Sequence, residues 1–223
     1  IKKIIMKWDY EFDVVVIGSG NGALTSAICS HDGGAKTLVI EKSTQFGGTS
    51  ATSGGGVWIP NNRYAKAENV DDSDQDARDY INSVSPEGQI KDELVETYLS
   101  EGPKMIDYLH ENSQVKYRNL AHYPDYFPDN PGGKAGNRSM EPEPIKGTEL
   151  GDDLGKLREQ HPQTAFTMGP INMNFTQVEG QLLLGALPGW KTQFAKLFTK
   201  YILDIPMRFK WGWKDRRLTM GNA

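Results

Sequence analysis

The chain has 223 residues, which is enough for one large domain or two small ones with a buried core. Its net charge of −4 and its lack of a basic cluster argue against a nucleic-acid partner. Cys29 is the only cysteine, which excludes an intrachain disulfide and favours a reducing compartment. No apolar run approaches the roughly 18 residues of a membrane span, and no secretory signal precedes the first expected strand. We therefore expect a cytoplasmic protein.

The segment from Val14 to Glu41 has the pattern of a dinucleotide-binding strand–helix–strand unit. The β-branched run 14–17 predicts a buried parallel strand. It leads into Gly18-Ser-Gly20-Asn-Gly22-Ala23, which fits G-x-G-x-x-G/A, and then into a helix over 23–30. The N–H groups that begin this helix would face phosphates. A second strand over 36–40 ends at Glu41, where a carboxylate binds a ribose hydroxyl. The flanking strands and the acidic residue make the motif far more specific than the glycines alone.

A second glycine-rich segment, Phe46–Gly56, follows directly. It suggests a long ligand whose far half also needs close approach of the backbone. The alternative is a flexible linker. The apolar residues of Val57–Pro60 argue against a linker, because a free linker needs no such anchor.

At this point the sequence resembles the FAD-binding oxidoreductases of the fumarate reductase flavoprotein superfamily. The stretch EKSTQFGGTSATSGGGVWIPNN is similar to the 3-ketosteroid Δ1-dehydrogenases, and so are YPDYF, GNRS, LGDDL and DRRLTMGNA further on. The resemblance covers residues 12–223 and implies FAD as the cofactor. The residues implied to contact FAD are Gly18, Ser19, Gly20, Gly22, Ala23, Glu41, Lys42, Ser43, Gly48, Thr49, Ser50, Ser53, Gly54 and Gly55.

The middle of the chain is predicted to be mainly helical. Residues 61–69 are polar and predict a surface connection, and acidic residues mark the start of a helix over 74–84. Apolar residues then recur at helical spacing. Because proline lacks the N–H and clashes with the preceding turn, Gly102-Pro103 predicts two helices, about 90–101 and 103–112, that pack on the sheet. A short strand over 115–118 follows.

The composition changes from Leu120 onward, where loop-forming residues with embedded aromatics precede two short helices over 182–187 and 194–205. We interpret residues 1–118 as the N-terminal part of an FAD-binding domain and 119–223 as the beginning of an inserted substrate domain. The predicted fold class is therefore α/β, with a Rossmann-like βαβ domain followed by the start of an α+β domain. The chain begins without methionine and stops in mid-pattern, so we expect a fragment.

The resemblance implies a reaction in which hydride leaves C1 of a 3-ketosteroid for the flavin while a tyrosine removes a proton from C2. A tyrosine base needs a neighbour that favours its phenolate, because its ordinary pKa is about 10. Tyr126 of Asp125-Tyr126-Phe127 matches the family's supporting phenol. Alternatively, Tyr126 only packs its loop against Phe127, or Tyr123 takes the role. In the family the principal base lies later in the chain, so the fragment alone is expected to be inactive.

Other interpretations stay open from the sequence. A fumarate- or urocanate-type reductase would need convergent cations such as Arg208, Arg216 and Arg217, but the neighbouring aromatics suit an apolar ring system better. A steroid Δ4-dehydrogenase and a truncated chain that only binds nucleotide are further alternatives. The four histidines show no metal-ligand spacing. An electron acceptor is implied as a partner, and the aromatic and basic stretch 209–214 suggests peripheral contact with a membrane surface.

Overall fold

The computed structural model describes residues 8–168, 171–212 and 215–223. The strands are β1 Val14–Ile17, β2 Thr37–Ile40, β3 Val57–Trp58, β4 Tyr117–Asn119, β5 Ser139–Pro142, β6 Ile145–Lys146, β7 Ala165–Met168, β8 Ile171–Asn174 and β9 Arg217–Leu218. The α-helices are α1 Asn21–Asp32, α2 Arg63–Ala67, α3 Asp74–Val84, α4 Asp92–Asn112, α5 Gln177–Leu184 and α6 Trp190–Trp211. The 3-10 helices are η1 Ser50–Thr52, η2 Gly147–Lys156, η3 Pro162–Thr164 and η4 Met220–Asn222.

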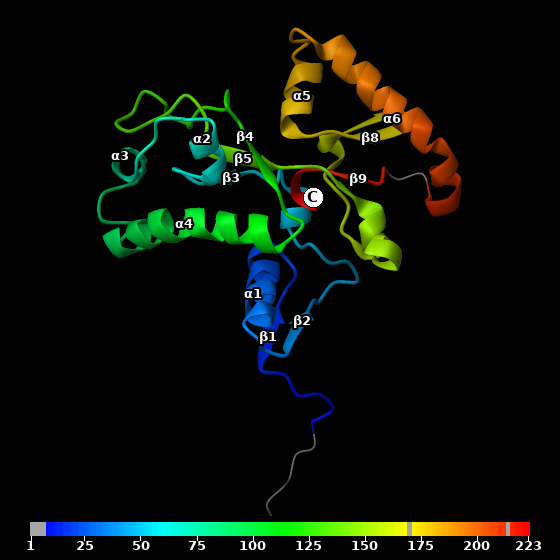
Figure 1. The fold of residues 1–223 in the computed structure, drawn as a ribbon, viewed down its shortest axis with the longest axis horizontal. Helices are drawn as coiled ribbons and strands as arrows, with labels where there is room; N and C mark the ends of the chain where they lie inside the picture. The colour runs from blue at the N-terminus through cyan, green and yellow to red at the C-terminus, as the bar shows by residue number, and fades with distance from the viewer. Residues whose placement is uncertain (1–7, 169–170, 213–214) are drawn as a thin grey trace, which may run out of the picture.

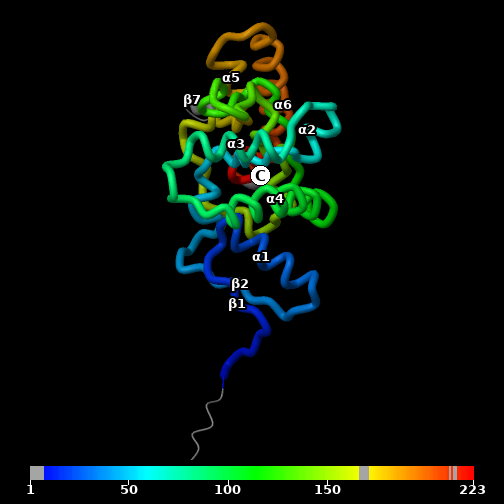
Figure 2. The backbone as a smooth tube through the Cα atoms, turned by 90° about the vertical axis from the view of Figure 1, so that its left-hand side faces the viewer, coloured from blue at the N-terminus to red at the C-terminus, as the bar shows by residue number. Residues whose placement is uncertain are grey.

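The elements follow one another in space as three parts. Figure 1 shows the β1–α1–β2 unit at one end, α4 with the small sheet β3–β5–β4 in the middle, and α5 and α6 at the other end. Figure 2, turned by 90°, shows the same succession from bottom to top. The C-terminus lies in the middle part (Figure 1). No helix in the described part of the chain has the length and apolarity that a membrane crossing requires.

The predicted strand–helix–strand unit is present. β1 pairs in parallel with β2, in a register that joins Val14 to Thr37 and Ile17 to Ile40. Gly18 has a φ of +97°, and its N–H donates to the Ile40 carbonyl at 2.7 Å. The prediction that the first strand is buried is wrong for this part of the molecule. Ile17 is 82% exposed, because β1 has β2 as its only strand partner among the described residues.

The middle part is built on an antiparallel sheet in the order β3–β5–β4. Its apolar core combines Ile59 and Met140 with Tyr117 and, from α4, Ile106. The strand predicted over 115–118 is found as β4, and α3 begins and ends where the helix over 74–84 was predicted. The surface connection predicted over 61–69 contains the short helix α2, which Asn62 caps by accepting from the N–H groups of Tyr64 and Ala65.

The predicted break at Gly102-Pro103 is wrong, because α4 runs through it as one helix of 21 residues. Gly102 has no Cβ, and a Cβ there would lie 3.2 Å from Ile59 Cδ1, so the glycine allows close packing at this point. Leu99 and Ile106 are buried on either side. Burying two such side chains contributes about 1.5–3 kcal/mol each, which together equals or exceeds the roughly 3 kcal/mol cost of a proline in a helix interior.

The last part joins the hairpin β7–β8 to α5 and α6. Its core contains Met173, Phe175, Leu197, Tyr201 and Met220. Both helices are longer than predicted. α5 begins at residue 177 instead of 182, because Thr176 and Glu179 form a complete capping box. α6 extends from 190 to 211 and includes Pro206, beyond the predicted range 194–205.

The C-terminal residues return to the second glycine-rich segment. η4 packs on η1, and Gly221 N–H donates to the Ser53 carbonyl at 3.2 Å. A Cβ on Gly55, which has a φ of +68°, would lie 2.5 Å from the Met220 backbone. The central sheet also combines β3, which precedes residue 118, with β5, which follows it. The structure therefore does not separate two domains at residues 118 and 119, and that division stays a prediction.

Candidate functional site

The first glycine loop leaves the N-terminus of α1 open. Gly20 is the residue that precedes the helix, and no side chain caps it. The first turn carries no acidic residue, and Asn21 N–H donates to Ser50 Oγ at 3.1 Å. A Cβ on Gly18 or Gly22 would meet nothing within 4 Å. A helix start without a capping side chain, with the positive end of the helix dipole and open space beside it, is suited to binding an anion.

Ser19 connects the two glycine-rich segments. Its side chain is 3% exposed, donates to Glu41 Oε2 at 2.5 Å and accepts from Gly47 N–H at 2.9 Å. The other carboxylate oxygen of Glu41 accepts from Ser43 N–H at 3.0 Å. The hydrogen bond from Ser19, followed by the one from Ser43, holds the pKa of Glu41 below its ordinary value of 4.5. Glu41 therefore stays an ionised acceptor at the tip of β2, as a ribose-binding carboxylate requires.

The predicted cofactor residues of the second glycine-rich segment differ in what they contact. A Cβ on Gly48 would lie 3.5 Å from the Gly20 backbone, so this glycine faces the first loop. Ser53 and Gly55 instead hold their own segment together, since Ser53 Oγ accepts from Gly55 N–H at 3.0 Å and donates to the Ser50 carbonyl at 2.7 Å. The remaining predicted residues are Ala23, half-buried in α1; Lys42 and Thr49, both exposed; and Gly54, whose Cβ position is open.

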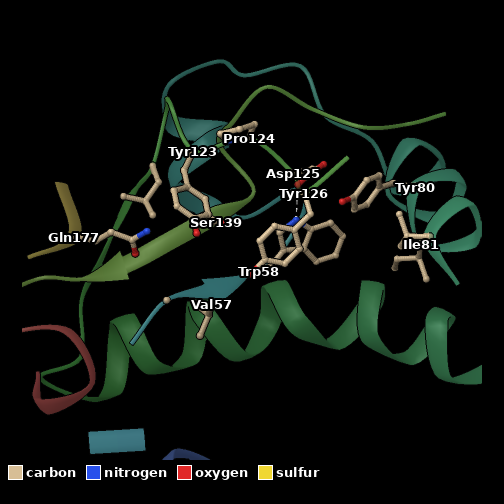
Figure 3. A pocket seen from close by; sticks show the side chains of 13 residues that line it. Val57, Trp58, Tyr80, Ile81, Tyr123, Pro124, Asp125, Tyr126, Ser139 and Gln177 are labelled. Atoms are coloured by element: carbon tan, nitrogen blue, oxygen red, sulfur yellow. Dashed lines mark hydrogen bonds between the residues drawn. The ribbon is translucent and has the colours of Figure 1, made fainter. Parts of the chain in front are cut away.

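A cavity of about 400 Å³ begins where the second glycine-rich segment ends. Its wall runs from Gly56 through β3 to α3 and to the loop that carries Tyr123 and Tyr126. Figure 3 shows Asp125, Tyr126 and Trp58 close together, with Tyr123 and Tyr80 on opposite sides of them. Both candidate phenols therefore line one cavity. The Tyr126 side chain is 85% exposed, so it extends from the loop instead of packing within it.

Trp58, Asp125 and Arg138 were assigned no role by the sequence analysis. Trp58 Nε1 donates to Asp125 Oδ1 at 2.6 Å, and Arg138 Nη1 donates to Asp125 Oδ2 at 3.0 Å. Two signals were available in the sequence. Asp125 directly precedes Tyr126, and Arg138 belongs to the GNRS stretch that resembles the family. Asp125 is 67 residues from Trp58 and 13 residues from Arg138, so both hydrogen bonds are tertiary contacts that no local pattern indicates.

Comparison with known proteins identifies the class of the chain. A family model described as an FAD binding domain matches residues 13–195. The chain belongs to this family of FAD-binding domains. The open glycine loop, the Ser19–Glu41 pair and the parallel β1–β2 unit agree with that assignment. The predicted cofactor and the predicted α/β FAD-binding fold are confirmed.

The relatives define the branch. The chain is 36% identical over 168 residues to the 3-oxosteroid 1-dehydrogenase of Mycolicibacterium smegmatis, covering 75% of this chain and 29% of the relative. It is 34% identical over 215 residues to the Comamonas testosteroni enzyme of the same name, covering 96% of this chain and 37% of the relative. The predicted resemblance is thus confirmed. The chain spans about a third of the length of these curated relatives.

A solved structure extends the similarity to three dimensions. It is the crystal structure of 3-ketosteroid delta1-dehydrogenase from Sterolibacterium denitrificans in complex with 1,4-androstadiene-3,17-dione. The match has a TM-score of 0.87 at 38% sequence identity, and it covers 95% of this chain and 36% of that chain. The fold described above is therefore that of the corresponding part of a steroid dehydrogenase.

Proposed function

We propose that this chain supplies the FAD-binding part and one wall of the substrate site of a 3-ketosteroid Δ1-dehydrogenase, which introduces a C1–C2 double bond into the steroid A ring. The observation that carries this proposal is the cavity beside the second glycine-rich segment, with Tyr126 on its wall. The similarity to enzymes named 3-oxosteroid 1-dehydrogenase supports it. An external electron acceptor reoxidises the cofactor.

The first glycine loop and Glu41 hold the ADP half of FAD. The diphosphate binds the N–H groups at the start of α1, because Gly20 lacks a capping side chain there. Glu41 accepts a hydrogen bond from the ribose, and Gly48 and Ser50 bring the second segment to the same place. Bound FAD supplies the oxidising group that accepts hydride.

The cavity suits a neutral ketone better than a carboxylate. Among the described residues that line it, none is Arg, Lys or His, and the one carboxylate, Asp125, is already paired with Arg138. A carboxylate substrate would need convergent cations, which favours the steroid interpretation over a fumarate-type one. Tyr126 donates its phenolic hydrogen to the tyrosine base contributed by the rest of the site. This hydrogen bond lowers the pKa of that base by stabilising its phenolate.

Turnover of a 3-ketosteroid by the full-length protein with bound FAD tests the proposal, with an artificial electron acceptor that changes colour. We expect the Δ1 product, and we expect Tyr126→Phe to reduce turnover about a hundredfold because the phenolate loses its donor. Tyr123→Phe is the matched variant, since Tyr123 lines the same cavity. A larger loss in Tyr123→Phe than in Tyr126→Phe would assign the supporting role to Tyr123. A Δ4 product or no steroid turnover would contradict the proposed function.

The stretch 209–214, for which membrane contact was predicted, lies partly outside the described residues, which omit 213 and 214. We further propose that the described helix α6 touches the membrane surface from the cytoplasmic side. Apolar residues recur at spacings of three and four along one face of α6, at Ala195, Phe198, Ile202, Pro206 and Phe209, and all are exposed. Leu203 is 75% exposed beside them, and three lysines of the helix, Lys196, Lys200 and Lys210, are exposed as well. An exposed apolar stripe bordered by lysines suits an interface with anionic lipids, where steroids also partition.

Sedimentation with phosphatidylserine-containing vesicles tests this contact. We expect binding that weakens with salt and with the change Ile202→Asp, which places a charge in the apolar stripe. Asp129→Asn, an exposed change in a distant loop, is the control and should bind like the wild type. Equal sedimentation of wild type and Ile202→Asp would contradict the contact.

A further inference from the structure

The loop around Tyr126 combines an exposed side chain with a backbone that is held by hydrogen bonds on both sides. The Tyr126 side chain is 85% exposed, whereas Asp125, one residue earlier, is 5% exposed. A charged group is rarely buried to this extent unless it is fully paired. The reason for the burial of Asp125 therefore has to be found in its partners.

The Asp125 carboxylate accepts from three donors, one in β3 and two in the loop between β4 and β5. Oδ1 accepts from the Trp58 indole N–H at 2.6 Å, and Oδ2 accepts from Arg138 Nη1 and from Lys134 N–H, each at 3.0 Å. Its own backbone N–H donates to the Lys134 carbonyl at 3.0 Å. The carboxylate thus ties the loop to β3, which follows the glycine-rich segment, and to the residue that precedes β5.

Arg138 is itself fixed on all sides. Its side chain is 1% exposed, and its Nη2 donates to Asp72 Oδ1 at 2.7 Å. Its guanidinium carbon lies 5.6 Å from the centre of the Trp58 ring and 5.8 Å from that of Tyr80. A planar guanidinium between two rings and two carboxylates has one orientation available. The hydrogen bond from Arg138 therefore holds the Asp125 carboxylate in one orientation.

The residue after Tyr126 is anchored as well. Phe127 N–H donates to the hydroxyl of Tyr80, a buried residue of α3, at 3.3 Å. The backbone is consequently held immediately before and immediately after Tyr126. Buried charged groups contribute little net stability compared with apolar residues of the same size, but the loss of one partner leaves the other charge uncompensated.

We propose that Asp125 is a positioning residue that fixes the direction in which Tyr126 enters the cavity, with Arg138, Asp72 and Trp58 holding the Asp125 carboxylate in place. This inference rests on the proposed function, in which the Tyr126 hydroxyl supports the base of a ketosteroid dehydrogenase. Asp125 touches neither the substrate nor the cofactor in this role. Its effect on the reaction passes through Tyr126 alone.

The change Asp125→Asn tests the inference in the full-length protein with bound FAD. The amide has the same shape but cannot accept from Trp58, Arg138 and Lys134 together. We expect turnover to fall about ten- to a hundredfold, because a misplacement of about 1 Å has this effect, while FAD content and KM stay near wild type. Asp129→Asn, an exposed aspartate in the same loop, should leave turnover unchanged.

A double-mutant cycle separates positioning from general stability. If Asp125 acts through Tyr126, Asp125→Asn has no further effect on turnover once Tyr126→Phe is present. An equal loss in both backgrounds would overturn the inference. Should Asp125→Asn fail to fold, Trp58→Phe removes one donor to the same carboxylate and enters the same cycle, with the same two outcomes.

Amide hydrogen exchange provides a readout that does not depend on turnover. We expect the N–H groups of residues 125 and 127, which donate to the Lys134 carbonyl and the Tyr80 hydroxyl, to exchange faster in Asp125→Asn than in the wild type, and exchange in Asp129→Asn to be unchanged. Absence of steroid turnover in the wild type would reject the proposed function. The exchange rates would still show whether Asp125 holds the backbone beside Tyr126. Unchanged exchange at both amides would overturn the inference.

Discussion

At the scale of single residues, Ser19 links the two glycine-rich segments of the cofactor half. One buried hydroxyl donates to the carboxylate that is expected to bind ribose, and it accepts from the backbone of the second glycine-rich segment at Gly47. A residue that occupies an unspecified position of the G-x-G-x-x-G motif thus determines how the two loops meet. Any side chain without a hydroxyl leaves a buried N–H without an acceptor.

We expect Ser19→Ala to weaken FAD binding about tenfold or more, since one hydrogen-bonded connection between the two loops is lost. Ser26→Ala is the control, because Ser26 is exposed and donates only to the Gly22 carbonyl of its own helix at 2.9 Å. A titration of flavin fluorescence measures both dissociation constants. Equal constants for Ser19→Ala and Ser26→Ala would show that Ser19 does not organise the site.

The depressed pKa of Glu41 predicts a pH dependence with a definite sign. Its pKa is below the ordinary 4.5 in the folded protein, so the ionised carboxylate stabilises the fold above that pH. The contribution is lost as the pH falls below 4.5 and through the folded pKa. We expect Glu41→Gln to be less stable than wild type at neutral pH, with a difference that closes in acid.

Urea unfolding at a series of pH values measures this difference, and Glu87→Gln provides the control at an exposed site. A difference in the free energy of unfolding between wild type and Glu41→Gln that widens as the pH falls would contradict the predicted direction of the pKa shift of Glu41.

At the scale of elements, the end of the second glycine-rich segment shows how two adjacent glycines differ. Gly55 has a φ of +68°, and a Cβ on it would overlap the Met220 backbone, whereas a Cβ on Gly54 would meet nothing within 4 Å. We expect Gly55→Ala to lower the free energy of unfolding by about 1–3 kcal/mol and Gly54→Ala to be nearly neutral. Urea denaturation of the two variants makes the comparison. Similar losses in both would show that η4 does not pack here.

Helix α4 carries a proline in its interior that its packing tolerates. Removing this proline restores a backbone donor, so we expect Pro103→Ala to raise the free energy of unfolding by about 1–3 kcal/mol. Lys104→Ala, an exposed change in the next position, should have little effect. The midpoints of thermal unfolding compare the two. A Pro103→Ala variant that is less stable than wild type would mean that the proline is required for the packing of Leu99 and Ile106.

The elements that were correctly predicted depend on local signals. The β1 strand, the glycine turn and α3 follow from β-branched runs, glycine and acidic caps, which act within a few residues. α4 was divided wrongly because the burial of Ile106 against Ile59 lies outside any local window. The predicted start of α5 was five residues too late, although Thr176 and Glu179 have the sequence pattern of a capping box that marks the true start.

At the scale of the whole molecule, the chain folds back on itself in ways that the sequence does not indicate. The C-terminal residues pack on the glycine-rich segment, and the central sheet joins β3, β4 and β5 from both sides of residue 118. The cofactor residues were inferred from motifs that lie within residues 18–56, and their contacts with FAD stay a prediction. The Asp125 cluster was not predictable, because Trp58 and Asp125 are 67 residues apart.

The two faces of the β1–β2 sheet differ in how far the rest of the molecule covers them. One side of β1 is open, with Val15 and Ile17 exposed, while α1 covers the other side. A parallel sheet is normally covered on both faces. The chain also spans about a third of its relatives' length. FAD binding by this chain is therefore the property that most directly reports whether its cofactor half is formed.

The measurement that tests this most directly is the visible absorption of the purified protein after incubation with FAD and gel filtration. We expect the flavin band to elute with the protein in stoichiometric amount, and we expect Ser19→Ala to retain less of it. Circular dichroism on the same fractions reports whether the chain is folded. A folded protein that elutes without flavin would contradict the assignment of the Gly18–Gly55 region as the cofactor site.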